Sequence, residues 1–212
     1  STRVRSSAAS DVYKRQAKAH KLFYIQDAMK NVIMVKEATP GYENEPVVIL
    51  QGHMDMVCEK EADCGIDMQT QGLDLQLEDN VISARGTTLG GDDGIAVAYA
   101  LAILESTDIP HPPLEVVFTV DEEIGMLGAA ALDMSPLKAR TMLNMDSEDE
   151  GYLLVSCAGG LTAKAHLPVK RDSVTDVSYM QLTVTGLLGG HSGVEIDKGC
   201  LLYTSPSPRD CS

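Results

Sequence analysis

The sequence predicts an α/β protein in which helices pack in layers on a β-sheet. Short apolar runs, typical of buried strands, alternate along the chain with segments of helical apolar spacing. Apolar residues make up 44% of the 212 residues and charged residues 23%, as in ordinary folded domains. Several apolar runs end in acidic residues, at the position where an open α/β sheet binds its ligands.

The first part of this alternation contains a strand, a hairpin and a helix. Residues 47–50 form the continuous apolar run Val-Val-Ile-Leu, which predicts a buried strand. Residues 73–84 alternate around Asp79-Asn80 and predict a β-hairpin. Residues 95–104 have helical apolar spacing, and the preceding pair Asp92-Asp93 suits the positive end of a helix dipole.

The second part continues the pattern and then changes. Residues 114–120 are β-rich, and residues 125–132 contain small residues that suit a helix packed closely on a sheet. After Gly159-Gly160 two strands follow each other without a helix, which predicts a second, smaller α+β domain from about residue 160. Further strands are expected at 141–145, 152–156, 161–169 and 177–185.

The two ends of the chain differ in composition from its middle. Residues 1–16 are rich in Ser and Arg, and residues 200–212 carry a Ser-Pro repeat. Neither segment has a sustained apolar period, and the first lacks the apolar core of a signal peptide. We interpret both as non-native, adaptor-like or disordered tails and expect the fold to lie between them.

Composition also limits the classes of function. A formal net charge of −14 argues against nucleic acid and anionic membrane surfaces as partners, because both attract clustered Lys and Arg. No apolar run reaches the roughly 18 residues of a membrane-spanning helix. The five scattered cysteines contain no C-x-x-C pair, so we expect reduced thiols in a cytoplasm rather than a disulfide framework or a zinc knuckle.

Side chains that can bind metal follow the predicted strands. His53 and Asp55 come directly after the first strand and, two residues apart, face the same side. Each signal has an ordinary alternative: a histidine at a strand end is usually a satisfied polar group, Asp92-Asp93 can cap a helix, and the acids at 121–123 can form a solvated turn. Jointly, however, the predicted sheet brings four candidates to one edge: His53, Asp92, Glu123 and Asp146.

The charge gathered at this edge indicates the cofactor. Three liganding carboxylates and a hydroxide carry about −4, which two divalent cations neutralise. Mixed imidazole and carboxylate ligands suit Zn²⁺, and Mn²⁺ and Co²⁺ are the alternative metals. The sequence therefore predicts a site for two divalent metal ions.

Five motifs, in this order along the chain, resemble those of the co-catalytic dizinc metallopeptidases: HMDMV, TTLGGDDG, VDEEIGMLGA, NMDSEDEG and GLLGGHSG. Within that superfamily the sequence is most similar to the aminoacyl-histidine dipeptidases (peptidase D), also called Xaa-His or cytosol non-specific dipeptidases. The resemblance covers residues 17–199. It implies an incomplete catalytic domain at 17–159, with a central mixed sheet flanked by helices, and the truncated start of an inserted α+β lid or dimerisation domain at 160–199.

The resemblance also implies how the metal ions are held. His53 would bind one ion, Asp92 would bridge both, Glu123 would bind the second ion and Asp146 the first. Asp55 would orient the His53 ring. The peptide bond between Asp92 and the next residue would be cis.

For catalysis, the resemblance implies that Glu122 is the general base. His191, in the second domain, would stabilise the oxyanion, often across a homodimer of the full-length protein. The family takes a further histidine ligand from a motif near its C-terminus that has no match here. We therefore expect this chain by itself to be inactive.

The implied function is metal-dependent hydrolysis of dipeptides, of the Xaa-His type or of broad specificity, in the cytoplasm. Two alternatives lie in the same superfamily: an N-acyl amino acid amidohydrolase and an aminotripeptidase. The tripeptidase branch typically has Lys where this chain has Gly94. An inactive fragment or a binding homologue is the non-enzyme alternative, but every early ligand position holds a competent residue, which favours an enzyme.

Overall fold

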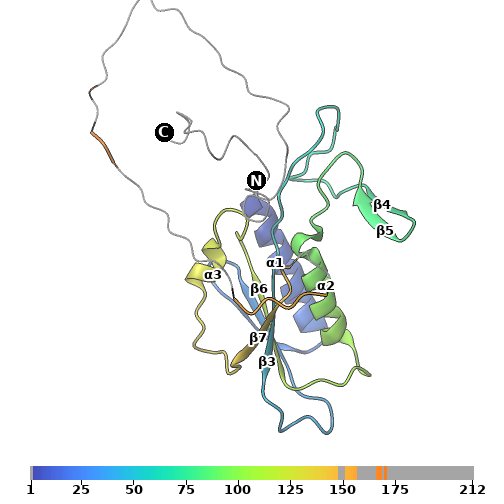
Figure 1. Ribbon diagram of the computed structural model, residues 1–212, viewed down its shortest axis with the longest axis vertical. Coiled ribbons are helices and arrows are strands. Elements are labelled where there is room, and N and C mark those ends of the chain that lie inside the picture. Colours follow the sequence, from blue (N-terminus) through green and yellow to red (C-terminus); the bar gives the residue numbers. More distant parts are fainter. Residues whose placement is uncertain (1, 148–150, 157–165, 169, 171–212) are drawn as a thin grey trace, which may run out of the picture. The chain divides into compact units, whose positions relative to one another are not determined.

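A computed structural model of the chain describes residues 2–147, 151–156, 166–168 and 170 (Figure 1). The chain divides into two units, Ser1–Val155 and Ser156–Ser212, and the account below concerns the first. The helices of this unit are α1 (Thr2–Ala19), α2 (Gly91–Glu105) and α3 (Leu127–Ala131). Its strands are β1 (Phe23–Gln26), β2 (Val32–Lys36), β3 (Val48–His53), β4 (Leu75–Glu78), β5 (Val81–Ala84), β6 (Leu114–Thr119) and β7 (Thr141–Asn144).

The main sheet is mixed, with the strand order β1-β2-β6-β3-β7. β1 pairs antiparallel with β2, and β2 pairs antiparallel with β6. β6 and β7 both run parallel to β3. The carboxyl ends of these three parallel strands therefore meet at one edge, which confirms the predicted fold class.

Helices cover one face of this sheet. Figure 1 shows α1 and α2 beside each other against the strands, while the β4–β5 hairpin stands apart from the main sheet. Side chains two apart along a strand share a face, so alternate residues of β2, β3 and β6 point toward the helices. They form the larger apolar core with the helices: Ala17, Val32, Met34, Leu50, Val97, Ala100, Leu104, Leu114, Val116 and Phe118.

The opposite face is covered by the segment between α3 and β7. Ile33, Ile49 and Val117 pack there against Ala139 and its apolar neighbours. Glu115 is the buried acid of this face, and its carboxylate accepts hydrogen bonds from the backbone N–H groups of Lys138 (2.8 and 3.1 Å) and Ala139 (3.1 Å). These bonds fix the covering segment to the centre of the sheet.

Most of the predicted elements are confirmed. The strands expected at 47–50, 114–120 and 141–145 correspond to β3, β6 and β7, and the helix at 95–104 lies within α2. The hairpin turns at Asp79 and Asn80, both with positive φ, as predicted. The helix expected at 125–132 is shorter, α3.

One predicted strand needs correction. Residues 152–156 form no strand, and Leu153 and Val155 are almost fully exposed, since no neighbouring strand in the described part of the chain pairs with them. Sequence analysis also left β1 and β2 unassigned. The strands expected at 177–185 and over most of 161–169, and the tail at 200–212, lie outside the described residues.

The N-terminal segment is also part of the fold. Residues 2–16 belong to α1, where Ser10 is buried and accepts a hydrogen bond from Gln26 Nε2 (2.7 Å). The Tyr13 ring packs edge-on against Phe118, with 5.1 Å between ring centroids. Tyr13 and Ala17 are the residues of this helix in the apolar core, which is too few to give a sustained apolar period.

Candidate metal centre

The end of β3 presents an oriented histidine. His53 is 2% exposed, and its Nδ1 lies 3.0 Å from the backbone carbonyl oxygen of Asp55. The Asp55 carboxylate is also close, with 3.5 Å between Nδ1 and Oδ1. A carbonyl oxygen can only accept, so Nδ1 carries the proton and Nε2 is the atom directed at the candidate site. Nε2 lies 2.9 Å from Asp92 Oδ1.

The start of α2 brings two aspartates to the same place. Asp92 and Asp93 have non-helical φ/ψ angles, and the peptide bond between them is cis, as the resemblance implies. The N-cap position of α2 is Gly90, and the side chains of Asp92 and Asp93 form hydrogen bonds with His53. Asp92 is half-exposed and faces His53, whereas Asp93 is 1% exposed.

Asp93 is a site residue that sequence analysis missed. Its Oδ2 accepts a hydrogen bond from the backbone N–H of His53 (3.1 Å), which ties α2 to the end of β3. Gly52 makes this approach possible, because a Cβ there would lie 2.7 Å from Asp93 Oδ2 and 2.8 Å from Ala96 Cβ. Two adjacent identical residues look equivalent in a sequence, and only the backbone angles separate their roles.

The loop after β6 carries the next acids. Asp121 is buried and has a φ of 55°, and Glu122 and Glu123 are half-buried, so this cluster is not the solvated turn considered above. The backbone N–H groups of Glu122 and Glu123 donate to Asp55 Oδ1 and Oδ2, both at 3.1 Å. Asp55 therefore holds both the His53 ring and this loop.

Two groups of side chains have ligand atoms close enough to share an ion. One group is His53, Asp92 and Glu123, and the other is His53, Asp93 and Asp146. Within each group all ligand atoms lie within 4.8 Å of one another. The structure thus brings all four predicted ligands together, adds Asp93, and leaves Glu122 beside both groups. His191 lies outside the described residues.

The electrostatics of the cluster are those of crowded negative charge. Burial raises the pKa of Asp93 to about 6, although the His53 N–H opposes the rise. Burial raises the pKa of Glu122 and of Glu123 as well, and neighbouring carboxylates add to the rise, Asp146 at Glu122 and Asp92 at Glu123.

At His53 and Asp55, hydrogen bonds outweigh the effect of burial on the pKa. Burial disfavours the protonated His53 ring, but hydrogen bonds with Asp55 and Asp92 outweigh it and raise the pKa of His53 to about 10. Burial also raises the pKa of Asp55, but hydrogen bonds from His53 and from the Glu122 and Glu123 N–H groups lower it overall. The cluster thus favours positive charge, and its imidazole and carboxylate donors fit divalent metal ions.

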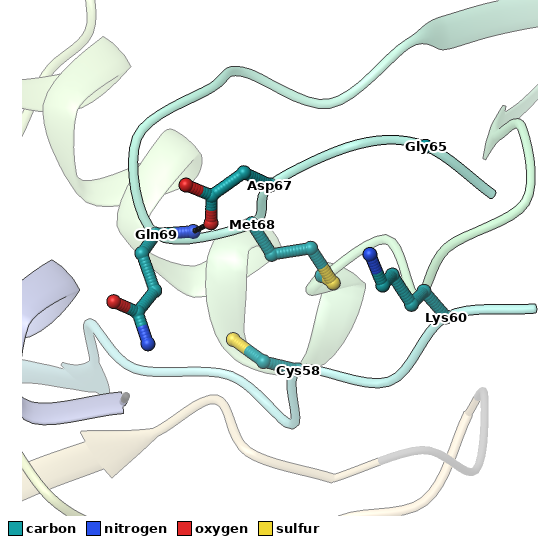
Figure 2. A pocket seen from close by; sticks show the side chains of 6 residues that line it. All are labelled: Cys58, Lys60, Gly65, Asp67, Met68 and Gln69. Carbon is teal, nitrogen blue, oxygen red and sulfur yellow. Dashed lines mark hydrogen bonds between the residues drawn. The ribbon is translucent and has the colours of Figure 1, made fainter.

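A separate pocket lies in the segment that follows β3. Figure 2 shows Cys58 and Met68 with their sulfur atoms toward it, and the Gln69 N–H bonded to the Asp67 carboxylate (3.0 Å). The pocket has a volume of about 350 Å³. Its lining is Cys58, Lys60, Gly65, Asp67, Met68 and Gln69, so none of the candidate ligands borders it.

The fold and the cluster together define an α/β protein with a candidate metal site at the carboxyl ends of its parallel strands. Comparison with known families places it further: the sequence profile of Peptidase family M20/M25/M40 matches residues 49–194. This match covers more than half of the chain, and the chain therefore belongs to that peptidase family.

Individual relatives agree with this assignment. The chain is 41% identical over 179 residues to the cytosol non-specific dipeptidase of Escherichia coli K12, a match that covers 84% of this chain and 37% of the relative. The crystal structure of aminoacylhistidine dipeptidase from Vibrio alginolyticus superposes with a TM-score of 0.67 and 40% identity, covering 69% of this chain and 30% of that one. A tripeptidase from Staphylococcus aureus gives a TM-score of 0.57 and 25% identity, covering 70% and 40%.

The chain thus spans about two fifths of the length of its Escherichia coli relative. Among the described residues, no helix is long and apolar enough to cross a membrane.

Proposed function

We propose that the full-length protein hydrolyses dipeptides, of the Xaa-His type or of broad specificity, with the help of two divalent metal ions. The observation that carries the proposal is the convergence of His53, four carboxylates and the neighbouring Glu122 at one sheet edge, in a member of a peptidase family. The names of the two dipeptidase relatives support the substrate class.

In this proposal His53, Asp92, Glu123 and Asp146 hold the ions, most simply Zn²⁺. Asp92 would be shared between the ions, since its carboxylate has two oxygens and its Oδ1 lies next to His53 Nε2. Asp93 helps to position His53 by accepting a hydrogen bond from its backbone N–H. The ions, when bound, supply Lewis acidity, which polarises a carbonyl group and makes water more acidic.

Glu122 acts as the general base. It belongs to neither ligand group, its backbone is fixed by Asp55, and its pKa is raised by burial and by nearby carboxylates. It accepts a proton from the attacking water, whose oxygen bonds to the scissile carbonyl carbon. The C–N bond then breaks, and Glu122 returns the proton to the leaving amine.

The remaining parts of the proposal rest on the resemblance. The catalytic domain ends near residue 159, a lid or dimerisation domain begins near residue 160, and His191 stabilises the oxyanion in a homodimer. The Escherichia coli relative is named as a cytosol enzyme, and we propose the cytoplasm for this protein too.

A substrate panel tests the function. A full-length version of the protein is given dipeptides with and without a C-terminal histidine, tripeptides and N-acyl amino acids. We expect dipeptides to be cleaved fastest, activity to disappear with a chelator, and Zn²⁺ or Mn²⁺ to restore it. Faster cleavage of N-acyl amino acids would establish an amidohydrolase instead, and faster cleavage of tripeptides an aminotripeptidase. Activity that survives complete metal removal would contradict the mechanism.

A further inference from the structure

A buried amide side chain connects the β1–β2 turn to the loop that carries Glu122 and Glu123. Asn31 is 1% exposed, and its Oδ1 accepts a hydrogen bond from the backbone N–H of Val120 (3.1 Å). Its Nδ2 donates to the backbone carbonyl of Gly128 (2.9 Å) and to Asp27 Oδ2 (2.6 Å). The orientation of the amide is fixed, because its nitrogen faces two acceptors and its oxygen faces a donor.

Val120 and Gly128 are the two ends of the acidic loop. The Gly128 N–H donates to the Val120 carbonyl (3.1 Å), so the chain closes on itself between these residues. The Val120 N–H and the Gly128 carbonyl take no part in this contact, and Asn31 forms hydrogen bonds with both. A Cβ at Gly128 would overlap the Val120 carbonyl oxygen and lie 2.6 Å from Asn31 Oδ1, so the closure depends on glycine.

The loop has little apolar packing to hold it in place. Ile124 and Met126 are 52% and 58% exposed. Asp121 and Met126 both lie in the left-handed region, with φ of 55° and 57°, where residues other than glycine are uncommon. Backbone hydrogen bonds within the loop hold its turns. Two side chains from outside add polar contacts: Asn31 bonds its base, and Asp55 bonds Glu122 and Glu123.

We propose that Asn31 is a positioning residue: by closing the base of the 121–127 loop it holds Glu122 and Glu123 at the metal centre. It touches neither substrate nor metal, and acts through the backbone of the loop. The proposal rests on the proposed function for the role of the two glutamates. The hydrogen bonds of Asn31 with Val120 and Gly128, here called the clamp, are a property of the polypeptide alone.

The test compares Asn31→Ala with Thr39→Ala in the 212-residue chain. Thr39 makes comparable hydrogen bonds with the backbone of His111, at the opposite end of β6 from Val120. Amide hydrogen exchange, followed residue by residue by NMR, reports on the loop without metal. We expect Asn31→Ala to speed exchange at Glu122 and Glu123 by about tenfold, relative to the β3 amides, whereas Thr39→Ala leaves that ratio unchanged.

A Co²⁺ titration of the same variants gives the second measurement. Asn31→Ala should weaken Co²⁺ binding by about 10- to 100-fold and alter the visible absorption of the bound ion, as loss of an orienting contact does. Thr39→Ala should leave both unchanged. If the unsubstituted chain binds no Co²⁺, the exchange data alone decide on the clamp, because this chain spans only part of its relative's length.

Asn31→Asp is a more conservative substitution, used in case Asn31→Ala does not fold. It keeps the size of the side chain and the acceptor for Val120 N–H but cannot donate to Gly128 when ionised, so faster exchange at Glu122 and Glu123 is expected here too. Unchanged exchange at these amides in a folded Asn31 variant would overturn the clamp. So would exchange in the unsubstituted chain as fast as in an exposed turn.

Discussion

Strand β6 has acidic side chains at both ends, and their surroundings differ. Glu115, near its amino end, is 3% exposed, and both of its carboxylate oxygens accept backbone N–H groups of the covering segment. Glu122 and Glu123, beyond its carboxyl end, are less buried, and their neighbours include other carboxylates, which raise their pKa. Burial of an acid therefore does not by itself mark a functional group. The partners of the carboxylate separate a structural acid from one available for chemistry.

The sharpest test of this comparison exchanges acid for amide at both ends of β6. In a full-length version of the protein, Glu122→Gln should lower kcat for dipeptide hydrolysis by about 10²- to 10⁴-fold, because an amide cannot accept the proton of water. Bound metal, measured by mass spectrometry, should be unchanged. Glu115→Gln is the matched control and should keep its activity. Loss of metal from Glu122→Gln would make Glu122 a ligand rather than the base.

A second test separates the acids within the metal centre. Asp92→Asn should weaken binding of both ions, since Asp92 is proposed to bridge them, whereas Asp146→Asn should weaken mainly one. Each affected affinity should fall by about 10-fold or more, as expected when a charged ligand is lost. Competition with a chromophoric chelator measures both steps in the full-length protein. Equal effects of the two substitutions would remove the bridging role of Asp92.

The close approach of β3 to α2 predicts a difference between two glycines. Gly52→Ala should lower the free energy of unfolding by about 1–3 kcal/mol, because its Cβ would collide with Asp93 and Ala96. Gly94→Ala, with no atom within 4 Å of its added Cβ, should be neutral or slightly stabilising in the helix. Urea denaturation of both variants measures the difference. A Gly52→Ala variant as stable as the parent would mean that α2 can move away from β3 without cost.

The smallest expected effect returns to the amino end of β6. Glu115→Gln keeps one acceptor oxygen but presents an amide N–H₂ to the backbone donors of Lys138 and Ala139. We expect a loss of about 1 kcal/mol in the free energy of unfolding, with metal affinity unchanged. Denaturation and a Co²⁺ titration on the same sample check both halves. A change in metal affinity would show that the two ends of the strand are coupled.

Sequence patterns predicted the elements with strong local signals and missed those that depend on distant partners. The continuous apolar run of β3 and the turn residues of the β4–β5 hairpin are such local signals. β1 and β2 contain four and five residues, and β1 is only partly buried, so their patterns are too short to stand out. Residues 152–156 have an apolar pattern but no partner strand among the described residues.

The same distinction applies to the metal centre. The acids at strand ends were visible as candidates because their residue types and positions follow the parallel-sheet rule. Asp93 and Asn31 were not, because their roles depend on backbone angles and on contacts with residues far along the chain. Asn31 meets Val120 across 89 positions, and no local pattern contains that information.

The pairing of β2 with β6 has a consequence for synthesis on the ribosome. Val32 pairs with Phe118, so β2 leaves the ribosome well before the strand that completes its pairing. Until then, β2 lacks one of the two strands that pair with it, and in this interval a nascent chain can misassociate or bind a chaperone. Because Glu122 and Glu123 follow β6 directly, the metal centre cannot assemble before this interval ends. The complete set of candidate ligands is therefore available only after both β2 and β6 have been synthesised.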